Sequence, residues 1–121
     1  MAALNTTAVL DLGALIAMFG HDRAKVSKLV LRFVESAGSG FDEMQRSLAG
    51  GDIGRMRELG HRIKSSARVV GAGAMATLCE RLEKLPVDPA TEQAAAAALL
   101  AELLPLLDQA SAQIDLYLAE A

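Results

Sequence analysis

The predicted fold depends on one stretch, Leu59-Gly60-His61-Arg62-Ile63-Lys64-Ser65-Ser66-Ala67-Arg68-Val69-Val70-Gly71-Ala72. At about 100° per residue, its apolar positions and one in the preceding turn share a side of a helix: Met56, Leu59, Ile63 and Val70. His61 lies roughly 200° from Leu59 on the same helical wheel, so its ring is expected to point away from that side. The stretch therefore predicts an amphipathic helix that presents an imidazole to solvent.

The neighbours of His61 on this helix are mostly cationic or small. The residues three, four or seven positions away are Arg57, Glu58, Lys64, Ser65 and Arg68. A rigid helix that carries an imidazole in such a stripe suits the reversible capture of a phosphoryl group. The alternative is a surface histidine on a basic helix face, without chemistry of its own.

The stretch resembles the motif of the histidine-containing phosphotransfer (HPt) domains of multistep phosphorelays. The motif has a small residue before the histidine, an aliphatic residue two positions after it, then lysine and small residues, and a glycine ten positions after it. The matching positions here are Gly60, His61, Ile63, Lys64, Ser66, Ala67 and Gly71. One position departs from the family, because Ser65 stands where the family has glycine.

This resemblance implies a role for each candidate site residue. His61 would be the phosphoacceptor, reacting through Nε2, and Lys64 would offset the charge of the phosphoryl group. Residues 78–83 look like the family's next helix, in which Glu83 would accept a hydrogen bond from the other ring nitrogen and orient the ring; a solvated charge is the alternative for Glu83. Ser65 would hydrogen-bond or crowd the phosphoryl group, and Arg68 would meet the partner or only solvent.

The resemblance also implies the partners, which are receiver domains of response regulators and a hybrid sensor histidine kinase. The sequence has no nucleotide-binding loop, kinase signature or Mg²⁺-binding motif, so we expect a phosphoryl carrier without a cofactor, and not an enzyme. A scaffold bundle that is never phosphorylated is the competing hypothesis. An enzyme that uses His61 would need a concave pocket, of which the sequence shows no sign.

Composition narrows the fold and the cellular context. The 121 residues are expected to form one domain, and abundant Ala and Leu without alternating β-branched runs favour an all-α fold. A net charge of −3 argues against general nucleic-acid binding. Cys79 is the single cysteine, which we expect to be a buried thiol. The N-terminus lacks the pattern of a signal peptide, so we expect a soluble, cytoplasmic protein without a membrane contact. We also expect it to be a monomer.

The order of caps and breakers predicts five helices. A short helix over 11–20 follows a frayed segment, 1–8. The bundle, 22–121, has a helix capped by Asp22 that passes through Gly38 and Gly40, a helix from Asp52 to about Gly71, one over 74–85 and one from about Thr91. The last is expected to kink at Pro105 without ending there. The prediction is an antiparallel up-down four-helix bundle with an extra short N-terminal helix.

The partner is expected to dock on a mostly apolar surface around His61. The candidates are the first short helix, with Leu12, Leu15 and Met18 partly exposed, and the small residues around Ser65. Lys64 and Arg68 would add electrostatic steering. His21 is expected to be a surface or capping residue. A metal site built from His21, His61 and Cys79 has no recognised ligand spacing, so no metal is expected.

Overall fold

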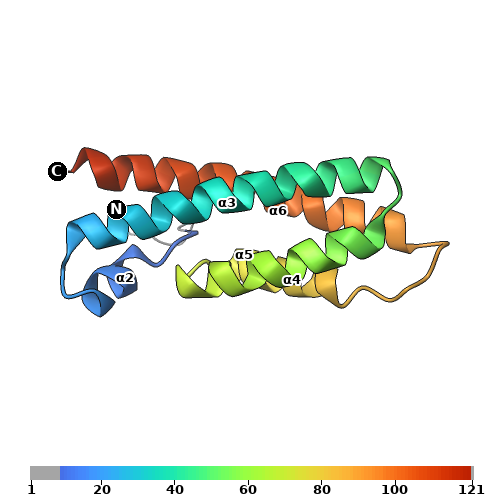
Figure 1. The fold of residues 1–121 in the computed structure, drawn as a ribbon, viewed down its shortest axis with the longest axis horizontal. Coiled ribbons are helices and arrows are strands. Elements are labelled where there is room, and N and C mark those ends of the chain that lie inside the picture. Colours follow the sequence, from blue (N-terminus) through green and yellow to red (C-terminus); the bar gives the residue numbers. More distant parts are fainter. Residues whose placement is uncertain (1–8, 121) are drawn as a thin grey trace.

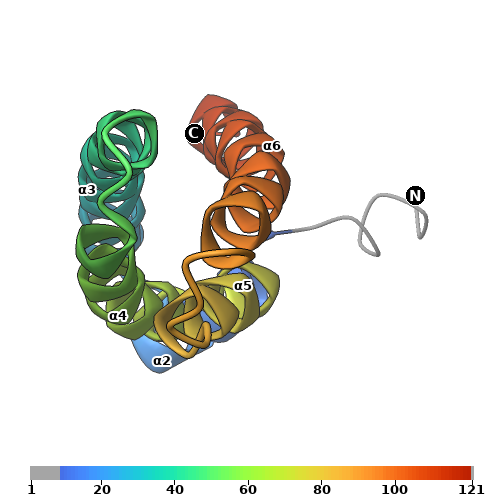
Figure 2. The same cartoon turned by 90° about the vertical axis from the view of Figure 1, so that its right-hand side faces the viewer.

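The computed structural model describes residues 9–120, so the fraying expected of residues 1–8 lies outside the described part. Five helices make up this part: α2 (Leu12–Met18), α3 (Arg23–Ala49), α4 (Ile53–Val69), α5 (Gly73–Glu83) and α6 (Glu92–Ala119). The four helices from α3 to α6 run alternately in opposite directions (Figure 1). Seen end-on, they follow one another around the core, with α3 and α6 above α4 and α5 (Figure 2). The predicted all-α, antiparallel bundle with a short N-terminal helix is confirmed.

Three aspartates start three of the helices, as their positions in the sequence predicted. The side chains of Asp11, Asp22 and Asp52 accept hydrogen bonds from backbone amides in the first turns of α2, α3 and α4, at 3.0, 3.1 and 3.0 Å. Each such cap satisfies an amide that the helix leaves unpaired and contributes about 1 kcal/mol.

Two interruptions in the sequence do not end the helices that contain them. α3 continues through Gly38 and Gly40, and α6 continues through Pro105. In both cases the apolar phase is unbroken, and burial of that apolar side outweighs the cost of about 1 kcal/mol for a glycine and about 3 kcal/mol for a proline. The turn after α4 needs glycine, since Gly71 has a φ of 71° and a Cβ there would lie 2.8 Å from Asp11 Cβ.

Side chains from every helix fill the core. The largest fully buried side chains are Phe41, Leu15, Met44, Met56, Met75, Leu82, Leu103 and Ile114. Three of these eight are methionines, whose side chains are long and unbranched. By length and composition alone, α6 would also suit a membrane span. The core helix of a soluble protein can share those properties; 28% of the apolar window of α6 is buried, and Leu99, Leu103 and Ile114 are among its buried residues.

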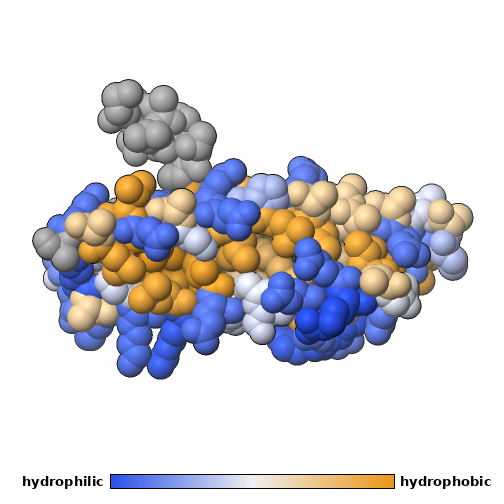
Figure 3. Space-filling model, turned by 90° about the horizontal axis from the view of Figure 1, so that it is seen from above, coloured by the Kyte–Doolittle hydropathy of each residue, from blue (hydrophilic) through white to orange (hydrophobic). Residues whose placement is uncertain are grey.

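Apolar side chains also gather on the outer surface formed by α3 and α6 (Figure 3). Leu31 of α3 and Leu116 of α6 are exposed, and half-buried residues such as Val34 and Leu107 pack beside the core. This surface lies on the side of α3 and α6 that faces away from α4 and α5 (Figure 2).

The short helix α2 lies where α4 ends and α5 begins, below the long helices (Figures 1 and 2). The segment before it is fixed to α6, because Gln113 accepts hydrogen bonds from the amides of Val9 and Leu10 and donates one to the carbonyl of Leu10. Leu15 is 2% exposed, so the prediction that it is partly exposed is wrong. A seven-residue helix cannot stay folded alone, so its apolar side is used to hold it against the bundle. Met18, at 68%, is exposed.

A charge introduced at Leu15 should therefore unfold α2 or the whole bundle. Leu15→Asp is expected to lower the free energy of unfolding by about 3 kcal/mol or more, because it buries a carboxylate without a partner. Met18→Asp, three residues along the same helix, should change stability by less than about 0.5 kcal/mol because Met18 is solvated. Thermal unfolding followed by circular dichroism measures both. Equal melting temperatures for the two variants would mean that α2 does not contribute to the core.

Candidate functional site

The site begins with a close approach of α4 to α5 at Gly60. Gly60 is buried, and a Cβ built on it would lie 2.9 Å from the carbonyl oxygen of Cys79 and 3.6 Å from Leu82 Cβ. Such a distance leaves no room for a larger residue without displacing the backbone of α5. The approach brings His61, the next residue of α4, close to Glu83, which lies one turn beyond Cys79 on α5.

Cys79 lies beneath the site and is fully buried, as predicted. Burial raises the pKa of its thiol to about 12, against a smaller lowering effect of the Lys64 ammonium. The thiol is therefore neutral at physiological pH and acts as a small apolar side chain in the core.

His61 and Glu83 form the central contact of the site. Nδ1 of His61 lies 2.7 Å from Oε2 of Glu83, while the side chains are 62% and 25% exposed. An ionised carboxylate only accepts hydrogen bonds, so the neutral imidazole must carry its proton on Nδ1. The lone pair is then on Nε2. The exposure of the ring agrees with the outward direction predicted by the helical wheel.

Lys64 occupies a different place from the one predicted. Its side chain is 10% exposed, and Nζ donates a hydrogen bond to Oε1 of Glu83 at 2.5 Å, so it is not part of an exposed cationic stripe. The long methylene chain of lysine allows the charged end to reach a carboxylate on the next helix while the stem is buried. The two oxygens of Glu83 thus serve different partners, His61 and Lys64.

The lysine also favours the ionised form of Glu83. Its hydrogen bond to Glu83, aided by that of His61, lowers the pKa of the carboxyl below its ordinary value, although partial burial acts in the opposite direction. Glu83 therefore stays ionised at neutral and mildly acidic pH. It remains an acceptor for His61 throughout that range.

The other candidate residues make local contacts. The hydroxyl of Ser65 donates to the backbone carbonyl of His61 at 3.5 Å, which turns it toward its own helix. Arg68 reaches Glu80 of α5 at 3.3 Å and is more than half exposed. Arg57, which the wheel placed in the stripe, binds the carbonyls of Leu85 and Pro86 and the carboxylate of Glu92, and so fixes the α5–α6 connection.

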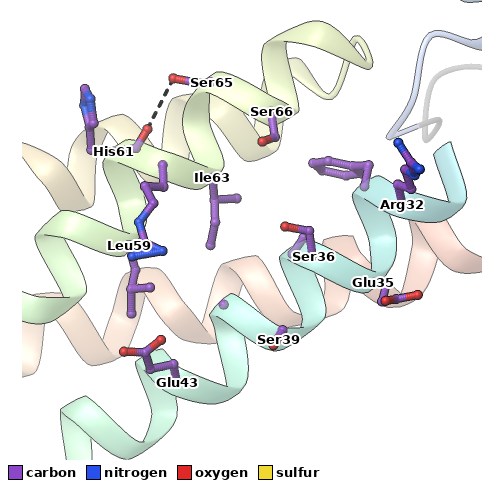
Figure 4. Close-up of a pocket in the computed structure, with 14 residues that line it drawn as sticks. Arg32, Glu35, Ser36, Ser39, Glu43, Leu59, His61, Ile63, Ser65 and Ser66 are labelled. Carbon is purple, nitrogen blue, oxygen red and sulfur yellow. Dashed lines mark hydrogen bonds between the residues drawn. The ribbon is translucent and has the colours of Figure 1, made fainter. Parts of the chain in front are cut away.

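A groove between α3 and α4 adjoins His61 (Figure 4). Its volume is about 690 Å³, and Ile63 and Ser66 of α4 lie across it from Ser36 and Ser39 of α3, whereas the side chains of His61 and Ser65 project from α4 away from α3. Gly40 lets the helices meet at its floor, where a Cβ would lie 2.7 Å from Ile63 Cδ1. Nothing in the sequence around His61 indicated this groove. The available signal was the run of small residues at 36–40, which interrupts the large side chains of α3.

Between residues 9 and 120, no group of three or more His, Cys, Asp or Glu side chains is arranged to hold a metal ion. His21 lies in the turn between α2 and α3 with a φ of 65°, exposed to solvent, as predicted for a surface residue.

The close approach at Gly60 predicts an asymmetry between two glycines of α4. Gly60→Ala should lower the free energy of unfolding by about 1–3 kcal/mol, because the new methyl group overlaps the carbonyl of Cys79. Gly54→Ala, in the first turn of the same helix, meets only the flexible carboxylate of Asp52 at 3.7 Å. It should stabilise the protein by up to about 1 kcal/mol through helix propensity. Urea denaturation separates the two, and equal effects of both substitutions would contradict the packing described at Gly60.

Comparison with known proteins gives the family of the chain. The family model described as the Hpt domain matches residues 28–115. The chain is also similar to the phosphorelay intermediate protein YPD1 of Saccharomyces cerevisiae, with 32% identity over 75 residues. The matched part is 61% of this chain and 45% of the yeast protein, so the chain spans less than half of that relative. No solved structure gave a significant match. Since the family model covers well over half of its residues, the chain belongs to the Hpt domain family.

Proposed function

We propose that the chain is a histidine phosphotransfer protein, which receives a phosphoryl group on Nε2 of His61 and passes it on. One observation carries the proposal. The ring of His61 is 62% exposed, yet its Nδ1 is held 2.7 Å from the carboxylate of Glu83. A histidine of a merely solvated helix face has no need of such a partner. A nucleophile needs it, because the partner fixes both the tautomer and the direction of the reactive nitrogen.

The chemistry is a transfer between an aspartyl phosphate and an imidazole. The lone pair of Nε2 attacks phosphorus, an N–P bond forms, and the P–O bond to the aspartyl carboxyl group breaks, so that the carboxylate leaves with the electron pair. Nδ1 keeps its proton, and the positive charge that develops on the ring lies next to the carboxylate of Glu83. The reverse reaction on a second aspartate delivers the phosphoryl group.

The proposed partners are receiver domains of response regulators and a hybrid sensor histidine kinase. The yeast relative is named as a phosphorelay intermediate, and an intermediate needs both a donor and an acceptor. The chain has no ATP-binding motif, so we infer a phosphoryl carrier rather than a classical enzyme, with the partner supplying the remaining catalytic groups and any metal. We further infer a soluble, cytoplasmic monomer that needs no nucleic acid.

The docking surface is proposed to follow α4 and the groove beside it. Ser36, Ser39 and Ser66 line that groove with short side chains, which leave the surface next to His61 open to a partner. Val69, two turns beyond His61 on α4, adds an exposed apolar side chain. Leu15 is no longer a candidate for direct contact, whereas Met18 of α2 remains one at the edge of this surface.

The function is tested by the replacement of His61. His61→Gln should abolish the uptake of phosphate from a phosphorylated receiver domain while the melting temperature stays within a few degrees of wild type, because the ring is not part of the core. The measurement uses a receiver carrying radioactive phosphate, and acid-labile label on the chain is counted. Wild-type protein that takes up no label from any receiver would favour the scaffold hypothesis. Label retained by His61→Gln would show that a residue other than His61 is the phosphoacceptor.

The docking surface is tested by adding bulk on α3. Ser39→Trp should weaken receiver binding by about 10-fold or more, since it fills a wall of the groove without entering the core. Met18→Asp should weaken it less, because Met18 lies beyond the end of α4. Receiver affinity is measured by calorimetry, together with thermal unfolding of both variants. A larger loss for Met18→Asp than for Ser39→Trp would place the docking surface on α2 instead.

A further inference from the structure

We propose that Lys64 is a positioning residue, which acts on His61 through Glu83 and does not bind the phosphoryl group. The proposal rests on the phosphotransfer function above and deepens it. It also replaces the role expected from the sequence, in which the lysine offsets the charge of the phosphoryl group directly.

The first observation is the position of the ammonium group. Nζ of Lys64 donates to Oε1 of Glu83, and the side chain is 10% exposed. Glu83 in turn uses its other oxygen, Oε2, for Nδ1 of His61. The three side chains thus form a linear chain of contacts in which Glu83 is the middle member and Lys64 the inner end.

The second observation is the direction of the reactive nitrogen. The two nitrogens of an imidazole direct their hydrogen bonds outward on different sides of the ring. Because Nδ1 is turned to Glu83, a group on Nε2 extends away from Glu83 and from the lysine behind it. For Lys64 to reach that group, it would have to leave Glu83 and move its charged end from a largely buried place past the ring.

The third observation is that Glu83 has two partners on α4, one for each carboxylate oxygen. Its side chain is attached to α5, whereas the ring it orients is attached to α4. A carboxylate bound at one oxygen only can rotate about its side-chain torsions and still satisfy that bond in several orientations. The bond from Lys64, one turn from His61 on α4, fixes the second oxygen and leaves one orientation. Without it, the imidazole is expected to sample both tautomers and more than one rotamer.

The inference is tested in the unphosphorylated protein, by nitrogen NMR of histidine labelled with ¹⁵N. At about pH 8 an ordinary imidazole is neutral, and the nitrogen shifts report which nitrogen carries the proton. The chain has only two histidines, so a His61→Gln sample assigns the signals, and His21 serves as an internal reference. Wild type should show His61 protonated on Nδ1, and Lys64→Met should show a mixture of tautomers.

Lys84→Met is the matched control. Lys84 follows Glu83 directly, but it is exposed and pairs with Glu80 at 3.5 Å, so its loss should leave the His61 signals unchanged. Should Lys64→Met fail to fold, as judged by circular dichroism, Lys64→Leu is measured instead, since it is shorter and has no donor for Glu83. These spectra need no partner and no phosphate, so they stand even if the proposed phosphotransfer fails.

Transfer rates then separate the two roles of the lysine. Lys64→Met should slow phosphoryl transfer from a receiver by about 10-fold. Losses of this size are typical when the removed residue holds a side chain that in turn orients the functional group. In a Glu83→Ala background the same substitution should change the rate by less than about 2-fold, because the lysine has lost the group through which it acts. An Nδ1-protonated His61 in Lys64→Met, or an equal loss of rate in both backgrounds, would overturn the proposal.

Discussion

The site depends on the close approach of α4 and α5 at Gly60. The axes of two packed helices usually lie about 8–10 Å apart, depending on the size of the side chains between them. Here there is no side chain at all at residue 60, and the backbone of Cys79 takes its place. His61 and Glu83 come from different helices, so their contact of 2.7 Å is sensitive to any separation of α4 from α5. The glycine before the histidine is therefore needed for the His61–Glu83 contact as well as for the packing of α4 on α5.

The arrangement combines an exposed imidazole with the more sheltered side chains of Glu83, which contacts it, and Lys64. The ring of His61 projects into solvent, where a partner can reach it, while Glu83 is partly covered and Lys64 is almost fully covered. Exposed ion pairs contribute little, since solvent and salt screen them. Because of this gradient of burial, the Lys64–Glu83 contact, which is nearest the core, is the least screened. In the proposed function, this contact is the anchor beneath the accessible imidazole of His61.

Much of the fold, and part of the candidate site, could be predicted from the sequence. The apolar phase and the aspartate caps determine helix type and approximate ends, and the phase also carries α3 across Gly38 and α6 across Pro105. The outward direction of His61 follows from its angle to Leu59. Glu83 was a candidate through the family resemblance, and its distance from Nδ1 agrees with that assignment, although its role remains a proposal. These features are local, or depend on one periodicity, and a single sequence contains them.

The features that could not be predicted depend on how far side chains reach and how helices meet. Lys64 lies near His61 on a wheel, but a wheel does not say that its long stem is buried and that its ammonium binds α5. Leu15 is on a short helix whose packing partner in the structure is α3, and the sequence of the short helix does not identify that partner. The groove beside His61 exists because small residues of α3 and α4 face each other, which requires knowledge of both helices at once.

The central claim is that Glu83 holds Nδ1 and leaves Nε2 to react. Its most direct test is to phosphorylate the ¹⁵N-histidine-labelled protein with a phosphorylated receiver domain and to identify the phosphorylated ring nitrogen by coupling between phosphorus and nitrogen. The account predicts one phosphohistidine, at His61, with the phosphoryl group on Nε2 and a proton remaining on Nδ1. A phosphoryl group on Nδ1 would contradict it, because that nitrogen could not then bind Glu83.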